Sequence, residues 1–298
     1  MTEAQPRVER LSEGARRLWL FNLDAELELA SRGPYQTAKH VARALEPVLI
    51  HARKLMAPGD AWLEDEDARK PDWRGWVGRA WCPTPSASRR LARVGAQLEP
   101  SPAIEILRRV NHRRFALELG GGAPLARYVE TEADVAATLR EASSAAWLFK
   151  KPFGFAGRGQ RRIAGAPSKD DRRWLEDALR HGGFLAEPWL DIERELSLHG
   201  LLDPSGRHTL GRVCVQQTNR FRAWISTVPA GPEDIDPAQV ATLRGRGVAV
   251  AEALAAAGYF GPFGVDAYLW RAAQGTLELN PLSELNARYT MGYSVGMR

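Results

Sequence analysis

The 298-residue sequence is poor in the features that mark several classes of protein. It has only two cysteines, Cys82 and Cys214, and neither lies in a metal-binding or redox motif. Isolated thiols are usually small core residues, so nothing indicates disulfides or a zinc site. No apolar run approaches membrane-spanning length, and the N-terminus has the charge but not the apolar core of a signal peptide. We therefore expect a soluble, cytoplasmic protein without a membrane partner.

The sequence also lacks a Ser-His-Asp or Cys-His constellation, a Walker A loop, a dinucleotide fingerprint and a recognisable nucleic-acid module. Its net charge is +5, and its basic residues are overwhelmingly arginines spread along the whole chain. A nucleic-acid-binding protein more often concentrates charge in one patch or arm, so we expect no nucleic-acid partner. Arginine-rich helix faces and a basic cleft for an anionic ligand such as a nucleotide fit equally well.

The order of the predicted elements indicates a mixed α/β protein. Residues 18–22 and 47–50 have the composition of buried strands, and residues 35–45 between them have the pattern of an amphipathic helix. This order predicts an α/β unit at the N-terminus. Farther along, Thr131 and Ser168 each precede an aspartate by three residues, which predicts helices capped at these two positions.

Carboxylates interrupt two apolar runs near the C-terminus. Residues 264–270 and 275–280 have strand composition, and residues 271–275 between them fit a hairpin connection. If the turn centres near residue 272, Asp266 lies across from Glu278, and Asn280 points to the same face. Their oxygens suit Mg²⁺ shared with phosphate. Taken alone, this spacing fits a solvated face, or carboxylates paired with arginines, better than a metal site. The choice therefore depends on motifs elsewhere in the sequence.

A glycine-rich segment follows a predicted strand at residues 146–152. It reads Gly154-x-x-Gly157-x-Gly159, with Arg158 inside it and Lys150 and Lys151 directly before it. Such a loop between strands can fold over a triphosphate and donate backbone N–H groups, although an ordinary hairpin turn explains the glycines about as well. The lysine that ends the strand favours phosphate.

A second segment has features that suit an adenosine-binding site. The strand around Glu187 leaves the sheet at Pro188, which exposes a backbone edge at Trp189 and Leu190. Glu195 begins an alternating strand nearby, where its carboxylate suits ribose hydroxyls. Any half-exposed strand shows the same alternation, so the segment is informative only with its neighbours.

Taken in order, these features closely resemble the ATP-grasp superfamily over residues 100–298. The resemblance implies two α+β subdomains that grip ATP between their sheets, here residues 101–185 with the glycine-rich loop and residues 186–298 with the metal site. Residues 1–100 resemble the small α/β domain that often precedes this fold.

The resemblance also implies roles for individual residues. Lys151 would contact phosphates under the loop, residues 187–190 would meet adenine, and Glu195 would hold the ribose. The nucleotide-binding residues implied are Arg113, Lys151, Gly154, Gly157, Arg158, Gly159, Glu187, Trp189, Leu190 and Glu195. The Mg²⁺ ligands implied are Asp266, Glu278 and Asn280.

The sequence departs from the family pattern at two places. Arg113, or Arg114 if the register slips, stands where the family usually has its first phosphate-binding lysine, and a guanidinium is no compact ammonium. Pro281 stands where an arginine often follows the asparagine. Some branches carry an E-x-N-x-R-x-T run, which residues 284–290 match, so we expect Arg288 to hold the substrate carboxylate or acyl phosphate.

The function implied is an ATP- and Mg²⁺-dependent ligase. It would activate a small-molecule carboxylate as an acyl phosphate for attack by an amine or thiol, with Arg288 and Lys151 as catalytic residues. Two alternatives remain open from the sequence: an ATP-grasp kinase that phosphorylates a hydroxyl, and a non-catalytic nucleotide-binding protein. A homodimer is possible.

Overall fold

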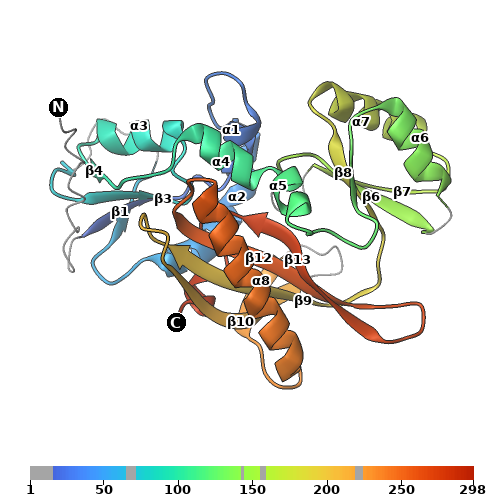
Figure 1. The fold of residues 1–298 in the computed structure, drawn as a ribbon. Helices are drawn as coiled ribbons and strands as arrows, with labels where there is room; N and C mark the ends of the chain where they lie inside the picture. Colours follow the sequence, from blue (N-terminus) through green and yellow to red (C-terminus); the bar gives the residue numbers. More distant parts are fainter. Residues whose placement is uncertain (1–15, 65–71, 142–143, 155–158, 219–223) are drawn as a thin grey trace, which may run out of the picture.

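The computed structural model describes residues 16–64, 72–141, 144–154, 159–218 and 224–298. The strands of these residues form three sheets that follow one another along the chain. Figure 1 shows the N-terminal and middle sheets on opposite sides of two short helices, with the C-terminal sheet below both. The predicted mixed α/β fold is confirmed.

The N-terminal sheet is parallel and has the strand order β2-β1-β3-β4. Its strands are β1 (Arg17–Leu20), β2 (Ala61–Trp62), β3 (Val77–Ala80) and β4 (Gln97–Leu98). The helices of this part are α1 (Ala25–Ala30), α2 (Lys39–Ala52), the 3₁₀ helix η1 (Arg53–Leu55) and α3 (Pro85–Arg93). Leu18, Leu20 and Leu91 form the core between sheet and helix α3.

The strand expected at residues 47–50 is wrong, because these residues continue helix α2. Val41 and Leu45 are buried at helical spacing, and Val48 and Leu49 carry the same apolar side of the helix onward. Pro47 removes one backbone hydrogen bond inside the helix, but the buried stripe on both sides keeps the chain helical.

The middle sheet is antiparallel and has the strand order β5-β8-β6-β7. Its strands are β5 (Arg127–Val129), β6 (Ala146–Lys150), β7 (Gln160–Ala164) and β8 (Phe184–Pro188), and its helices are α6 (Glu132–Arg140) and α7 (Lys169–Arg180). The predicted caps are confirmed, since Thr131 accepts from the Asp134 amide and Ser168 forms a capping box with Asp171. Phe149 and Phe184 pack edge to face in the core, 5.2 Å apart.

Two consecutive helices, α4 (Ile104–Asn111) and α5 (Arg113–Glu118), connect the outer parts. His112 separates them and caps α5, because its Nδ1 accepts a hydrogen bond of 3.1 Å from the Arg114 amide. Helix α5 therefore begins at Arg113, which places that side chain at the junction of the three sheets.

The C-terminal sheet is antiparallel and has the strand order β11-β10-β9-β12-β13. Its strands are β9 (Ile192–Leu202), β10 (His208–Thr218), β11 (Trp224–Pro229), β12 (Gly261–Arg271) and β13 (Leu277–Asn286). Helix α8 (Pro237–Ala256) crosses one face of this sheet, and the short helix α9 (Tyr293–Gly296) ends the chain (Figure 1). Leu243, Val250 and Leu254 of α8 join Leu196 and Leu198 in the largest core cluster.

The register of β12 and β13 differs from the one expected. The turn occupies residues 272–276, where the Gly275 amide bonds the Ala272 carbonyl. Strand β13 does not end at Asn280 but runs on through Pro281 to Asn286. Proline is tolerated there because β13 is an edge strand, and an irregularity in the pairing absorbs two extra residues. As a result Asp266 pairs with Glu284, and Glu278 pairs with Trp270.

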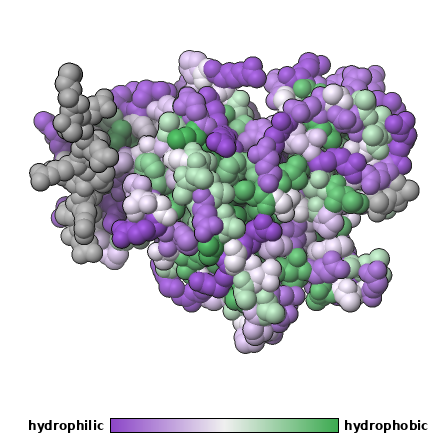
Figure 2. Space-filling view, in the orientation of Figure 1, coloured by the Kyte–Doolittle hydropathy of each residue, from purple (hydrophilic) through white to green (hydrophobic). Residues whose placement is uncertain are grey.

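The surface of the face in Figure 2 mixes hydrophilic and hydrophobic side chains, with the hydrophobic ones gathered near its centre. The most exposed large apolar residues, Ile50, Leu125 and Ile225, come from different parts of the chain. Scattered apolar exposure of this kind is ordinary for a protein surface. No helix among the described residues has the length and apolar character needed to cross a membrane.

Gly121 and Gly122 join the end of α5 to β13. The Gly122 amide donates to the Leu282 carbonyl at 2.8 Å, and its carbonyl accepts from the Asn280 side chain at 2.7 Å. Gly122 has φ +89°, and a Cβ there would lie 2.9 Å from the Ala126 Cβ. Only glycine meets both demands without strain.

We predict that Gly122→Ala lowers the free energy of unfolding by about 2 kcal/mol, through its left-handed backbone and this close contact. Gly245 is the matched control, because it lies exposed in helix α8 with no atom within 4 Å of an added Cβ. Gly245→Ala should stabilise by roughly 0.5–1 kcal/mol. Urea unfolding of both variants checks this, and equal effects would contradict the role of Gly122.

Candidate active site

Three oxygen-bearing side chains meet where β12 and β13 pair. Asp266 lies directly across from Glu284 on β13, so both carboxylates share one face of the sheet. The Asn286 amide donates to Asp266 Oδ2 at 2.9 Å, and Gln216 of β10 donates to Oδ1 at 2.6 Å. The extra residues in β13 therefore assemble Asp266, Glu284 and Asn286 at one point.

The negative charges of the two carboxylates repel each other. Burial, and then the neighbouring Glu284 charge, raise the pKa of Asp266 to about 7. The Gln216 hydrogen bond and Arg288 oppose this rise, and Glu195 adds to it. A cation between the carboxylates would relieve the repulsion, which makes the donor set chemically suited to a hard divalent ion.

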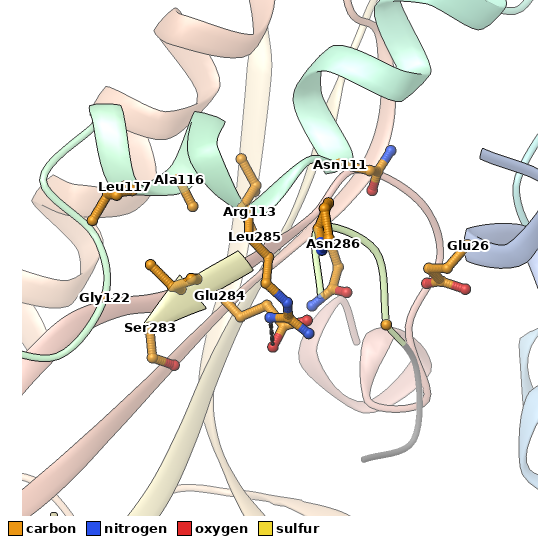
Figure 3. Close-up of a pocket in the computed structure, with 13 residues that line it drawn as sticks. Glu26, Asn111, Arg113, Ala116, Leu117, Gly122, Ser283, Glu284, Leu285 and Asn286 are labelled. Carbon is orange, nitrogen blue, oxygen red and sulfur yellow. Dashed lines mark ion pairs between the residues drawn. The ribbon is translucent and has the colours of Figure 1, made fainter. Parts of the chain in front are cut away.

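Arg113 and Lys150 supply the positive charge of the site. The Arg113 guanidinium lies 2.7 Å from Glu284 Oε2, as the dashed line in Figure 3 marks. Burial alone would raise the pKa of Glu284, but Arg113 and then Lys150 outweigh it and hold that pKa below its ordinary value. Glu284 is thus ionised beside an Asp266 that protonates more readily.

Arg113 also ties the site to the middle sheet. It is 7% exposed, and its Nε donates to the Lys151 carbonyl at 3.0 Å while its amide donates to the Pro152 carbonyl at 3.1 Å. The Arg113 side chain therefore bonds both the Lys151 carbonyl after β6 and the Glu284 carboxylate of β13 from the start of α5.

The two successive lysines face different partners, as neighbours at the end of a strand do. Lys150 Nζ lies 2.5 Å from Glu187 Oε2 and acts on Glu284, whereas Lys151 Nζ lies 2.7 Å from Asp177 on α7. The structure therefore places Lys150 beside the carboxylates. Lys151 stays at the base of the glycine-rich loop, where its amide donates to the Gly159 carbonyl at 2.8 Å.

Several of the described residues expected to bind nucleotide lie around the same junction. Gly154 lines a cavity with Arg113 and Leu185, and Gly159 ends the loop with φ +76°. Gly157 and Arg158 lie outside the described residues. Helix α5, the end of β6, β13 and Glu26 of α1 enclose this cavity, so it lies where the three parts of the chain meet (Figure 3).

The expected adenosine-binding residues continue from the cavity along β8 and β9. Glu187 is buried and holds both Lys150 and the Ala123 amide, the latter at 3.0 Å. Trp189 is 37% exposed, and Leu190 follows it before the start of β9. Glu195 pairs with Tyr268 and shares the face of Asp266, so it lies close to the carboxylates.

The structure does not bring Glu278 and Asn280 to Asp266, and the register expected for them is wrong. Glu278 is exposed opposite Trp270. Asn280 is buried, and its amide donates to the Gly122 carbonyl and, at 2.9 Å, to the Tyr268 hydroxyl. Its oxygen accepts from the Leu282 amide at 3.0 Å. Asn280 thus fixes the bend of β13.

Glu284 and Asn286 are the site residues that sequence reasoning missed. A second E-x-N follows the first by six residues, and it leads directly into Arg288. Residues 284–290 therefore contain the motif that indicates Glu284 and Asn286, although only Arg288 was predicted from it. Choosing between the two E-x-N copies requires the length of the hairpin turn and the bend at Pro281, which spacing does not supply.

Arg288 is buried, and its guanidinium donates hydrogen bonds to oxygens of the protein. Its Nε and Nη2 bind Glu26 of helix α1, Nη2 also donates to Asn286 Oδ1 at 3.0 Å, and Nη1 donates to the Tyr289 carbonyl at 2.9 Å. Arg288 thus links the N-terminal helix to Asn286.

Among the described residues, no group of three or more His, Cys, Asp or Glu side chains is arranged to hold a metal ion. The candidate set contains only two carboxylates and one amide. Such a set fits Mg²⁺ that takes its remaining ligands from water and phosphate, rather than a metal caged by protein alone.

No family model and no curated protein matches the sequence. Solved structures do match. Pyruvate carboxylase from Rhizobium etli is 16% identical, with 95% of this chain and 27% of that chain covered and a TM-score of 0.56. N5-carboxyaminoimidazole synthetase from Staphylococcus aureus, solved with ADP, is 14% identical over 97% and 79% of the two chains, with a TM-score of 0.53.

Biotin carboxylase from Campylobacter jejuni is 13% identical, with 74% of this chain and 55% of that chain covered and a TM-score of 0.53. All three are ATP-grasp enzymes. The chain therefore has the ATP-grasp fold, as the sequence predicted. At these identities the similarity establishes the fold alone, so any function has to be argued from the residues of the site.

His199 lies on β9 near the site but is enclosed by the C-terminal segment. It is 2% exposed and packs against Gly292, Gly296 and the ring of Tyr293. Burial lowers its pKa from 6.5 to about 4. The imidazole is therefore neutral in the folded protein at neutral pH.

This burial predicts an acid-sensitive component of stability. Between pH 6.5 and 4 the unfolded chain binds a proton at His199 and the folded protein does not, so stability falls as the pH falls, by about 3 kcal/mol over the window. Asp266 acts in the opposite direction, because its pKa is raised.

A difference measurement isolates the contribution of His199. His199→Gln should remove this component from the pH dependence of unfolding, whereas His40→Gln, at an exposed residue of α2, should leave it intact. Urea titrations at pH 7, 6, 5 and 4 measure it. The same pH slope in His199→Gln and the parent protein would contradict the assignment.

Proposed function

We propose that this protein is an ATP- and Mg²⁺-dependent ligase that activates a substrate carboxylate for attack by an amine or thiol. The observation that carries the proposal is the convergence of Asp266, Glu284 and Asn286 on one face of the C-terminal sheet, with Arg113 and Lys150 over them. The proposal divides the chain into residues 1–100, 101–185 and 186–298, although strand β8 of the middle sheet crosses the second boundary.

The nucleotide would lie between the middle and C-terminal sheets. The Staphylococcus aureus synthetase was solved with ADP, and its fold is shared over nearly the whole of this chain. The glycine-rich loop with Lys151 would cover the phosphates, residues 187–190 would meet adenine, and Glu195 would hold the ribose. In support, Gly154, Arg113 and Glu284 line one cavity, and Glu195 shares the face of Asp266.

Asp266, Glu284 and Asn286 would hold Mg²⁺, in place of the set with Glu278 and Asn280. When bound, the ion would neutralise charge on the terminal phosphates of ATP. Arg113 and Lys150, which balance Glu284 in this structure, would then be free to stabilise the transferring phosphoryl group. Lys151 would act from the base of the loop.

The proposed reaction has two steps. A carboxylate oxygen of the substrate bonds the γ-phosphorus, and ADP leaves with the electrons of the broken P–O bond. The nucleophile then bonds the acyl carbon as the C–O bond to phosphate breaks, and its proton leaves with the phosphate. Both steps need positioned charge rather than a side-chain nucleophile.

A kinase acting on a hydroxyl is the second candidate. The expectation that Arg288 holds the substrate carboxylate favoured a ligase, but Glu26, Asn286 and Tyr289 occupy this arginine here. The metal site and nucleotide site would serve either reaction. A chemical trap for the activated carboxylate therefore has to decide between them.

The metal-site proposal predicts different outcomes for two glutamates on one strand. Glu284→Gln should lower Mg²⁺-dependent ATP turnover at least about 100-fold, because a ligand charge facing the phosphates is lost. Glu278→Gln, at an exposed position of the same strand, should stay within about twofold. Steady-state ADP release measures both, and a loss in Glu278→Gln with activity retained in Glu284→Gln would overturn the assignment.

The ligase proposal predicts that ADP release with Mg²⁺ and hydroxylamine requires one class of small carboxylate. The matching acid should accumulate as its hydroxamate, because hydroxylamine attacks an acyl phosphate. A screen of amino acids and small carboxylates measures ADP and hydroxamate together. ADP release with a phosphorylated hydroxyl product and no hydroxamate would show the kinase instead, and ATP binding without turnover would show a non-catalytic protein.

A further inference from the structure

Glu26 of helix α1 reaches into the site from the N-terminal part of the chain. It is 5% exposed, lines the cavity with Glu284 and Asn286, and binds Arg288, 262 residues away in sequence. Figure 3 shows Glu26 on the other side of the cavity from Glu284, with Asn286 between them. It therefore belongs to the site although no sequence motif marks it.

One oxygen of Glu26 has no hydrogen-bond partner among the described residues. Both contacts with Arg288 are made by Oε1, while the buried Oε2 receives no hydrogen bond from any described residue. Burying a carboxylate oxygen without a donor is costly. Glu28, two residues on, shows the ordinary arrangement, because its two oxygens accept from the Ser86 amide and hydroxyl.

The hydrogen bonds of Arg288 and Glu26 show which of the two side chains has an unused polar atom. Arg288 directs four of its five N–H groups at protein oxygens and keeps one Nη1 donor. Glu26 Oε2, by contrast, is an acceptor that no described residue uses. A carboxylate oxygen accepts hydrogen bonds and attracts positive charge, which selects against an anionic ligand at this point.

We infer that Glu26 is a specificity-determining residue that binds the acceptor amine in its protonated form. The ammonium passes one proton to Glu26 Oε2, and the neutral amine then bonds the acyl carbon. This inference rests on the proposed function and narrows its nucleophile from an amine or thiol to a cationic amine. An ammonium carries three donors and a positive charge, so it gives Oε2 a charge-assisted hydrogen bond. A neutral thiol offers one weak donor and would satisfy Oε2 less well.

The test uses hydroxylamine, which is uncharged at pH 7.5, beside protonated amines. With the acid found by the hydroxamate screen, the acceptors are ammonium, ethanolamine, putrescine and the amino acids. Glu26→Gln should raise KM for the best protonated acceptor about tenfold or more, because a charge-assisted hydrogen bond is lost. KM for hydroxylamine should stay within about twofold, and Glu28→Gln should change neither value.

A measurement on the parent protein keeps the inference testable if Glu26→Gln does not fold. Methylammonium should inhibit hydroxamate formation competitively against hydroxylamine, whereas methanol, of similar size but uncharged, should not. Equal inhibition by the two, or an equal KM change for charged and uncharged acceptors in Glu26→Gln, would overturn the role of Glu26. If the parent protein forms no hydroxamate from any acid, the proposed function itself fails.

Discussion

The pairing of Asp266 with Glu284 is the constraint on which the rest of the site depends. Two carboxylates face each other across neighbouring strands, an arrangement that repulsion disfavours. The fold tolerates it because Arg113 comes from helix α5, Lys150 from the middle sheet, and Gln216 and Asn286 bond Asp266. The site is therefore a balance of charges contributed by all parts of the C-terminal two-thirds of the chain.

The same balance couples the N-terminal part to the chemistry. Arg288 binds Asn286 on one side and Glu26 on the other, so a movement of helix α1 acts directly on a proposed metal ligand. Buried ion pairs contribute little net stability but fix geometry, and breaking one leaves an uncompensated charge. The N-terminal part of the chain thus contributes to the site, because its helix α1 places Glu26 in the cavity lining.

Much of the architecture was predictable from the sequence, because caps and apolar patterns act locally. Thr131 and Ser168 cap the helices expected, and the ATP-grasp order of elements was recognisable. Residues 47–50 were misassigned because a short apolar run around Pro47 suits a strand or a buried helix equally. The register of the last hairpin was mispredicted because it depends on Pro281 lying in an edge strand, and Glu26 was missed because only tertiary folding brings it to Arg288.

The most direct measurement is a crystal structure with ADP and Mn²⁺ in place of Mg²⁺, in which anomalous scattering locates the ion without assumptions about the protein. The account predicts a manganese peak bonded to Asp266, Glu284 and Asn286 and to phosphate oxygens. A peak at Glu278, or nucleotide bound in the cavity with no ion at the three oxygen side chains, would contradict it.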